Sequence, residues 1–415
     1  MPLRISRAQE LAESSTCLLN ISFNVPKSMN FLHVIPSLDS INGGTVEGLK
    51  QLGAALMELG HGVDVVTLDA PDMPYLLEHP FTKVIALGPA KLSYRYSARL
   101  IPWLKQNASN YDSVMIEGLW QFHSFATWRA LRQMDIPYFV FTHGMLSPWF
   151  KKAYPLKHLK KWLYWPWAEY QVLRHAKAVL FTSDEERLLS RESFWLYRCR
   201  EAVVGYGTVR SSGDPDAQRA KFLASYPGLR GQRIFLFLSR IHEKKGCDLL
   251  VAAFAKVAAR DANLRLVMAG PDQTGWKEAL VALAERIGVA EKIVWTGMIS
   301  GDMKWGAYHA AEVFALPSHQ ENFGVVVAEA LSCGLPVLVS NKVNIWREVE
   351  AEGAGIIAED DLAGTETLLT RWLDMDEGSR SVMRERSLEC FDRHFEISRT
   401  AERLLRLVMK GPRQS

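Results

Sequence analysis

The sequence predicts an α/β protein with two doubly wound, Rossmann-like domains that face each other across a cleft. Short, continuous apolar runs alternate with longer amphipathic segments, which is typical of parallel strands covered by helices on both faces. The length of 415 residues exceeds what one hydrophobic core usually supports. The alternation also stops once, in the stretch 205–219 rich in Gly, Ser, Asp and Pro, and then restarts.

The first half of the chain carries the pattern of one such domain. The buried-strand candidates are FLHVI (31–35), VDVVTL (63–68), SVMIE (113–117), YFVFT (138–142) and AVLFT (178–182). Apolar residues at helical spacing between 46 and 59 predict a helix after the first strand. Ser183 followed three residues later by Glu186 predicts a capping box that starts another helix.

The second half repeats the pattern with its own strands. These are IFLFLS (234–239), LRLVMA (264–269), KIVWT (292–296), EVFAL (312–316) and PVLVS (336–340). The tail from about Ser381 is charged and helical in pattern, without a strand signal. In doubly wound domains the ligand lies at the carboxyl ends of the strands, so functional motifs should follow strands directly.

Composition excludes several classes of protein. The 49 basic and 46 acidic residues nearly balance, which argues against a nucleic-acid partner. The five cysteines are scattered and form no CxxC pair, which disfavours a disulfide framework and a structural zinc site and fits a reducing cytoplasm. The sequence has no apolar run long enough for a transmembrane helix, and residues 1–28 make a poor signal peptide.

The first motif, SLDSINGGTVEGL (37–49), follows the first strand. The glycine pair Gly43 and Gly44 lets backbone amides approach an anion at a helix N-terminus. A tight turn without a ligand is the alternative interpretation. The motif is neither GxGxxG nor a Walker sequence, so a dinucleotide cofactor or an ATPase lacks its usual support.

The second motif, LSRIHEKKGCDLL (238–250), also follows a strand. Arg240 and Lys245 suit a diphosphate, because an arginine fork and a lysine point charge both bind phosphate oxygens. The alternative is a solvated basic loop. The strand-end position and the glycine that opens the next helix support a functional site, so the two interpretations have about equal support.

The third motif, ENFGVVVAE (321–329), places two glutamates eight positions apart. Glu321 stands where a helix can begin, and Glu329 lies roughly 12 Å further along the axis if the whole span is helical. Two carboxylates at that distance cannot share a proton or one metal ion, but they can hold hydroxyls at opposite ends of an extended ligand. A plain surface helix fits poorly, because Glu329 lies among apolar residues and an ionised group there needs a partner.

Two further segments each allow two interpretations. His143 in THGMLSPWF follows a strand, where a histidine is either structural or functional. Residues 149–167 (WFKKAYPLKHLKKWLYWPW) interleave lysines with aromatic residues, which suits an anionic membrane surface or a lipid-diphosphate acceptor. They also fit a solvated amphipathic helix whose aromatic residues pack on the domain.

Together these motifs resemble the retaining glycosyltransferases of the GT-B fold, specifically glycosyltransferase family 4, over nearly all of residues 30–410. ENFGVVVAE followed by ALSCGLPVLVS is the most specific part. By this resemblance Arg240 and Lys245 bind the diphosphate of a nucleotide sugar and Glu329 binds the ribose hydroxyls. Donor-sugar contacts are implied for the side chain of Glu321 and for the backbone of Asn322, Phe323 and Gly324. Gly43 and Gly44 are implied to face the phosphates and the acceptor, with His143 near the sugar.

The resemblance also implies a reaction. The sugar of the nucleotide donor, which is a substrate and not a cofactor, passes to a glycan or lipid-linked acceptor with retention, in bacterial surface polysaccharide biosynthesis. The leaving phosphate helps to deprotonate the acceptor, so no protein nucleophile is required. Asp-x-Asp occurs only at 214–216 and 374–376, away from strand ends, so metal independence is expected. The alternatives are a sugar-nucleotide epimerase of related fold and a catalytically silent GT-B binding protein.

The strand pattern and the resemblance together predict four segments. Residues 1–28 are expected to be a poorly ordered extension, 29–207 the acceptor-side domain and 208–385 the nucleotide-sugar-binding domain. Residues 386–415 are expected to form a helical tail that packs back toward the N-terminal domain. We expect a cytoplasmic protein, peripheral on the inner face of the membrane if residues 149–167 bind it.

Overall fold

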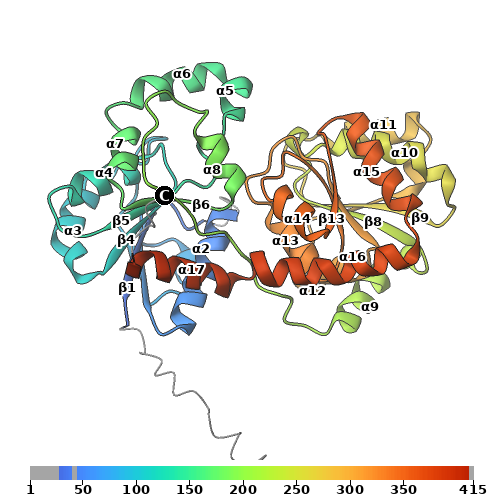
Figure 1. Cartoon of the computed structure of the whole chain (residues 1–415), viewed down its shortest axis with the longest axis horizontal. Helices are drawn as coiled ribbons and strands as arrows, with labels where there is room; N and C mark the ends of the chain where they lie inside the picture. The colour runs from blue at the N-terminus through green and yellow to red at the C-terminus, as the bar shows by residue number, and fades with distance from the viewer. Residues whose placement is uncertain (1–27, 40–43, 411–415) are drawn as a thin grey trace, which may run out of the picture.

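The computed structural model describes residues 28–39 and 44–410. Within these residues the strands form two parallel sheets, one of seven strands and one of six, which lie side by side as two lobes (Figure 1). This confirms the predicted class of two doubly wound α/β domains. The expected disorder of residues 1–28 falls outside the described residues except for Ser28, whose hydroxyl donates to the carbonyl of Gly60 at 2.8 Å.

The N-terminal sheet has the order β3-β2-β1-β4-β5-β6-β7. Its strands are β1 (Asn30–Ile35), β2 (Gly62–Thr67), β3 (Lys83–Ala86), β4 (Ser113–Glu117), β5 (Tyr138–Phe141), β6 (Ala178–Phe181) and β7 (Glu201–Val203). The five predicted strands are confirmed, and β3 and β7 at the two edges were missed. The central strands β4, β5 and β6 are buried along their whole length, which explains their continuous apolar sequences.

Helices cover both faces of this sheet. They are α2 (Gly44–Glu58), α3 (Leu100–Asn107), α4 (Phe122–Leu131), α5 (Trp149–Ala153), α6 (Pro155–Tyr164), α7 (Glu169–His175) and α8 (Asp184–Ser190). The predicted helix start at α8 is confirmed, because the Ser183 hydroxyl accepts from the amide of Glu186 at 3.1 Å. The second bond of the predicted capping box differs: the Glu186 carboxylate accepts from the amide of Thr182 and not from that of Ser183. Among the described residues no helix is long and apolar enough to cross a membrane.

The C-terminal sheet has the order β10-β9-β8-β11-β12-β13. Its strands are β8 (Arg233–Leu238), β9 (Leu264–Ala269), β10 (Ile293–Gly297), β11 (Val313–Leu316), β12 (Val337–Ser340) and β13 (Gly355–Ala358). Its helices are α9 (Pro215–Ser225), α10 (Cys247–Val257), α11 (Lys277–Arg286), α12 (Gly301–Ala310), α13 (Val325–Ser332), α14 (Trp346–Glu352), α15 (Leu362–Asp374) and α16 (Glu377–Cys390). The edge strand β13 was missed.

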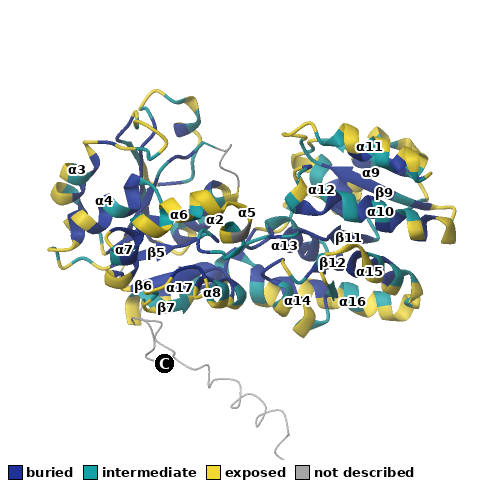
Figure 2. Cartoon of the chain, turned by 90° about the horizontal axis from the view of Figure 1, so that it is seen from above, coloured by how far each residue is buried: buried dark blue, intermediate teal, exposed yellow. Residues whose placement is uncertain are grey.

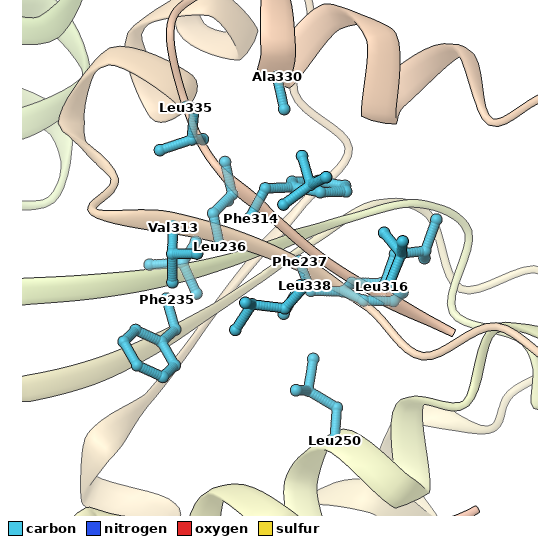
Figure 3. Packing of buried hydrophobic residues seen from close by; sticks show 14 of the residues in the cluster. Phe235, Leu236, Phe237, Leu250, Val313, Phe314, Leu316, Ala330, Leu335 and Leu338 are labelled. Atoms are coloured by element: carbon cyan, nitrogen blue, oxygen red, sulfur yellow. The ribbon is translucent and has the colours of Figure 1, made fainter. Parts of the chain in front are cut away.

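The core of the C-terminal domain gathers on both faces of its central strands. Phe235 and Phe237 from β8 point to one side with Leu250 of α10, while Leu236 and Phe314 face Ala330 of α13 (Figure 3). All six side chains are fully buried. This packing fixes α10 and α13, whose N-termini lie at the carboxyl edge of the sheet.

The chain passes between the domains twice. It first leaves β7 for α9, and it later returns from α16 through residues 391–395 to α17 (Ile397–Lys410). At the crossing Thr208 and Glu396 pair as a short parallel bridge. Helix α17 then lies along α2 in the N-terminal lobe (Figure 1). Its residues Ala401 and Leu404 are fully buried in one apolar cluster with β1 and α2.

Candidate active site

Loops at the carboxyl ends of the two sheets face each other across a cavity of about 1150 Å³. Its wall includes Ser147, Trp149 and Glu185 from the N-terminal domain and His242, Lys244 and Gln320 from the C-terminal domain. Lys244 and Gln320 directly precede the predicted residues Lys245 and Glu321. The domains also touch beside the cavity, where Arg347 Nε pairs with Glu185 Oε2 at 2.7 Å.

Arg240 and Lys245 both follow β8, but they lie in different environments. Arg240 is exposed, and its Nη1 donates to Gln273 Oε1 at 3.2 Å. Lys245 is buried at the end of a single 3₁₀ turn (Glu243–Lys245) and pairs with Glu321 through a short contact. The exposed guanidinium is therefore free to meet an anion, whereas the ammonium already has a carboxylate partner.

Gly246 makes this turn possible. Its φ is 64°, in the left-handed region, and a Cβ at this position would lie 2.1 Å from the carbonyl oxygen of Pro317. A larger residue would therefore push the loop after β8 away from the loop after β11. The glycine thereby brings Lys245 and Glu321 together.

Glu321 lies in the loop after β11, not in a helix. Its amide donates to Lys342 O at 2.9 Å and its carbonyl accepts from Asn344 N at 3.0 Å, which ties it to the loop after β12. Burial alone raises the pKa of Glu321, but the charge and the hydrogen bond of Lys245 outweigh it and lower that pKa. Glu321 is therefore held as an ionised acceptor.

Residues 322–324 join the loop to α13 and reach the other domain. Asn322 Nδ2 donates to Thr182 Oγ1 at 3.3 Å, across the domain boundary. The ring of Phe323 meets Tyr206 edge-on, with 5.2 Å between centroids. Gly324, with φ of 76°, caps α13, so the first amides of the helix open toward the end of the sheet.

Glu329 lies within α13 and is held by residues that the sequence analysis did not identify. Lys304 Nζ donates to its Oε1 at 2.7 Å, and the hydroxyl of Tyr308 donates to its Oε2 at 3.0 Å. The predicted need for a partner is thus met by α12, where Lys304 and Tyr308 are four residues apart on one helix face. The i, i+4 spacing of these two donors was the sequence signal that could have identified them.

His143 begins the loop after β5 on the opposite domain, with a φ of 46°. Its Nε2 lies 2.6 Å from Glu117 Oε2, and His33 Nδ1 lies 2.7 Å from Glu117 Oε1. Burial raises the pKa of Glu117, but hydrogen bonds and charge from the two histidines lower it to about 2. Glu117, at the end of β4, was also missed by the sequence analysis.

A second buried carboxylate fixes the loop that carries His143. Glu186 Oε1 accepts from the hydroxyl of Thr142 at 2.6 Å and from the amide of Gly144 at 2.5 Å. Its Oε2 accepts from the amide and the hydroxyl of Thr182, both at 2.7 Å. Glu186 therefore holds the strand ends of both β5 and β6.

The glycine pair is only partly described. Gly44 is the first residue of α2, and its carbonyl accepts from the Tyr206 hydroxyl at 2.9 Å. Gly43 lies outside the described residues. Within them, the structure brings Lys245 and Glu321 into contact and sets Glu329 in separate contacts within the same domain. His143 belongs to the facing domain.

Comparison with known proteins identifies the class to which this fold and site belong. The model of the glycosyl transferase 4-like domain matches residues 43–207, and the model of glycosyl transferases group 1 matches residues 221–387. The two matches together span most of the chain. The architecture is that of GT-B glycosyltransferases, and the chain belongs to the glycosyltransferases of family 4.

Individual relatives cover less of the chain. An uncharacterized glycosyltransferase of Methanocaldococcus jannaschii is 32% identical over 146 residues, which are 34% of this chain and 37% of that protein. A D-inositol 3-phosphate glycosyltransferase of Rhodococcus erythropolis is 29% identical over 49% of this chain and 48% of its own length. The chain thus spans about a third to a half of the curated relatives that it matches.

Solved structures match the fold over almost the whole chain. Sucrose-phosphate synthase from Thermosynechococcus elongatus has a TM-score of 0.73 at 21% identity and covers 92% of this chain and 98% of its own. Anabaena HepE in complex with UDP has a TM-score of 0.74 at 17% identity and covers 92% of this chain and 100% of its own. At these identities the likeness concerns the fold.

Proposed function

We propose that the protein is a retaining glycosyltransferase that moves a sugar from a nucleotide diphosphate sugar to a glycan or lipid-linked acceptor, in bacterial surface polysaccharide biosynthesis. The observation that carries the proposal is the contact of Lys245 with Glu321, which joins the loop after β8 to the loop after β11. A cation and an ionised carboxylate thus meet at the carboxyl edge of a parallel sheet, a few residues before the first amides of α13.

Each of these groups has a part in the proposed transfer. Arg240 and Lys245 stabilise the charge that develops on the leaving diphosphate, which is the main demand of the reaction. Glu321 accepts hydrogen bonds from the hydroxyls of the donor sugar, beside the backbone of Asn322, Phe323 and Gly324. Glu329 accepts from the ribose, and Lys304 and Tyr308 hold its carboxylate in place.

The acceptor side belongs to the N-terminal domain, with Gly43, Gly44 and His143. In the transfer, the bond between the anomeric carbon and the diphosphate oxygen breaks, and a bond to the acceptor oxygen forms on the same face. The leaving phosphate takes the acceptor proton, which needs neither a protein nucleophile nor a metal. We also propose that residues 149–167 meet an anionic membrane surface, so that the protein is cytoplasmic and peripheral.

Nucleotide binding gives the first test. A ligand that binds only the folded protein raises its melting temperature, so one of UDP, GDP and ADP or their sugars should raise it by a few degrees. Arg240→Ala should remove most of that shift and lower sugar transfer about 100-fold or more, as loss of a charge-stabilising donor does. Arg230→Ala, on an exposed residue before β8, serves as the matched control. Unchanged binding and transfer in Arg240→Ala would refute the site assignment.

Product analysis separates the alternatives. An epimerase would release a free isomer of the sugar nucleotide without any acceptor, and a silent binding protein would bind the nucleotide without turnover. A retaining transferase should release nucleoside diphosphate only when an acceptor is present, with the anomeric configuration of the donor kept in the product. Chromatography of the nucleotide and NMR of the new linkage provide these two measurements.

A further inference from the structure

Helix α6 exposes its leucines to solvent, while two of its polar residues face the protein. His158 stacks on Phe194 with 4.8 Å between ring centroids, and Lys161 Nζ lies 4.5 Å from the centre of the Trp120 ring, whereas Lys157 and Lys160 are exposed. Its leucines face solvent, with Leu156, Leu159 and Leu163 exposed to 79%, 55% and 62%. None of the described residues of α6 is buried, and the helix shows much exposed surface (Figure 2).

This arrangement partly fits the expectation that the aromatic residues pack on the domain. Trp165, just after α6, is fully buried and stacks on Phe194 at 4.5 Å. The leucines at i, i+3 and i+7 form the outer stripe, where an amphipathic helix of a soluble domain normally carries polar residues. A continuous apolar stripe of this kind marks an interaction surface.

The segment just before the stripe borders the cavity between the domains. Trp149 of α5 and Tyr154, which joins α5 to α6, both line that cavity. Tyr154 is also 44% exposed, next in sequence to the start of α6. One uninterrupted segment of chain therefore forms the wall of the cavity at one end and the leucine stripe at the other.

Charge along this path is uneven. Lys157 Nζ lies 4.8 Å from the centre of the Tyr154 ring, and Lys244 Nζ lies 4.9 Å from the centre of the Trp149 ring, so a cation lies over each of these two aromatic residues of the cavity wall. Residues 149–167 contain no Asp or Glu. The cavity wall itself is rich in carboxylates, from Glu185, Glu192, Glu243, Asp248 and Asp360. Cations suit a phosphate, and carboxylates suit the hydroxyls of a sugar.

We infer that the acceptor is an amphiphile in which a phosphate joins a hydrocarbon tail to a saccharide. The tail lies on Leu156, Leu159 and Leu163, the phosphate lies between Lys157 and Lys244, and the saccharide enters the cavity. This inference rests on the proposed function, from which it selects the lipid-linked acceptor. It also assigns α6 to the acceptor and not only to the bilayer.

Dodecyl phosphate, kept below its micelle concentration, tests the inference by calorimetric titration of the full chain. It should bind about tenfold or more tightly than inorganic phosphate, and more tightly than dodecyl maltoside, which has a tail but no phosphate. A variant with Leu156→Ser, Leu159→Ser and Leu163→Ser should lose that advantage. The control carries Leu77→Ser, Leu92→Ser and Leu362→Ser, which change exposed leucines elsewhere. Lys157→Gln should lower the affinity for dodecyl phosphate and leave the affinity for dodecyl maltoside unchanged.

The outcomes separate this inference from the proposed function. Equal affinity of the α6 serine variant and the wild type overturns the inference, as does a wild type that binds dodecyl phosphate no better than inorganic phosphate. The inference is also overturned if the wild type is a dimer and only the α6 serine variant is a monomer, because a second copy of the chain then covers the stripe. Nucleotide melting shifts are measured in parallel. Nucleotide binding without amphiphile binding refutes the inference alone, whereas amphiphile binding without nucleotide binding refutes the proposed function.

Discussion

Glu117 and Glu169 are both buried in the N-terminal domain, and their surroundings move their pKa values in opposite directions. Glu117 lies between His143 and His33, and its pKa is lowered to about 2. Glu169 lies beneath α6, where its Oε1 accepts from the Trp120 amide at 2.7 Å and from the Ser124 hydroxyl at 2.8 Å. Burial raises the pKa of Glu169 to about 7, against those hydrogen bonds and the charge of Lys161.

The difference teaches that partners decide the charge of a buried carboxylate. Both side chains are almost inaccessible to solvent, at 3% for Glu117 and 0% for Glu169. Two imidazoles keep the first ionised next to the candidate active site. The second has an oxygen, Oε2, without a hydrogen-bond partner, so its charged form is poorly compensated.

The largest expected effect is that of Glu117→Gln. An amide presents only one acceptor to His143 and His33, and the buried charge network is broken. We expect a loss of about 3 kcal/mol or more in the free energy of unfolding, measured by urea at pH 7. Glu78→Gln, an exposed substitution in the same domain, is the control. A loss below about 1 kcal/mol would mean that the histidines find other acceptors.

Glu169→Gln, unlike Glu117→Gln, should raise the free energy of unfolding at high pH. The amide keeps an acceptor for Trp120 and Ser124 and needs no charge in the apolar surroundings. At pH 8 we expect the variant to be more stable than the wild type by up to about 3 kcal/mol, from the difference between a pKa of about 7 and the ordinary value. The same urea titration at pH 4, where Glu169 is mostly protonated in both the folded and the unfolded state, should show little gain. A variant that is less stable at pH 8 would contradict the assignment.

The pH dependence of the wild type should show both groups. The folded pKa of Glu169 is raised, so its contribution to stability is present below its unfolded pKa and is lost as pH rises through about 7. The folded pKa of Glu117 is lowered, so its contribution is present above its unfolded pKa and is lost as pH falls toward about 2. Glu169→Gln should flatten the alkaline limb of the stability curve and Glu117→Gln the acidic limb. The comparison would be refuted if Glu169→Gln flattened the acidic limb and Glu117→Gln the alkaline limb.

The smallest effect is expected from Lys161→Met. Its ammonium lowers the pKa of Glu169, so its removal should raise that pKa further and steepen the alkaline limb by less than about 1 kcal/mol. Lys160→Met, on the exposed side of α6, should leave the limb unchanged. Urea unfolding at pH 6 and pH 8 measures the difference. Equal pH dependence of stability in the two variants would show that Lys161 does not influence the pKa of Glu169.

The sequence predicted the interior of the fold better than its margins. Strands β4, β5 and β6 are buried on both faces and read as continuous apolar runs. The missed strands β3, β7 and β13 lie at sheet edges, have only three or four residues and leave much of their surface half-buried. Edge strands need less apolar sequence, so their signal is weak.

The site divides in a similar way. Residues that follow a strand in a local motif, such as Arg240, Lys245 and Glu321, could be proposed because the motif and the strand end are adjacent in sequence. Glu117 could not, because its partners come from 84 residues before it and 26 residues after it. Lys304 and Tyr308 were missed for the same reason, since their link to Glu329 runs between two helices.

The return of α17 to the first domain has a consequence for synthesis of the protein. Ala401 and Leu404 complete the apolar cluster that β1 and α2 begin, so the first domain is completed by residues that follow the second domain in sequence. During translation, the face of α2 that α17 covers stays open until the whole second domain has been made. The order of folding on the ribosome is thus reversed for that face: the N-terminal domain starts first and closes last.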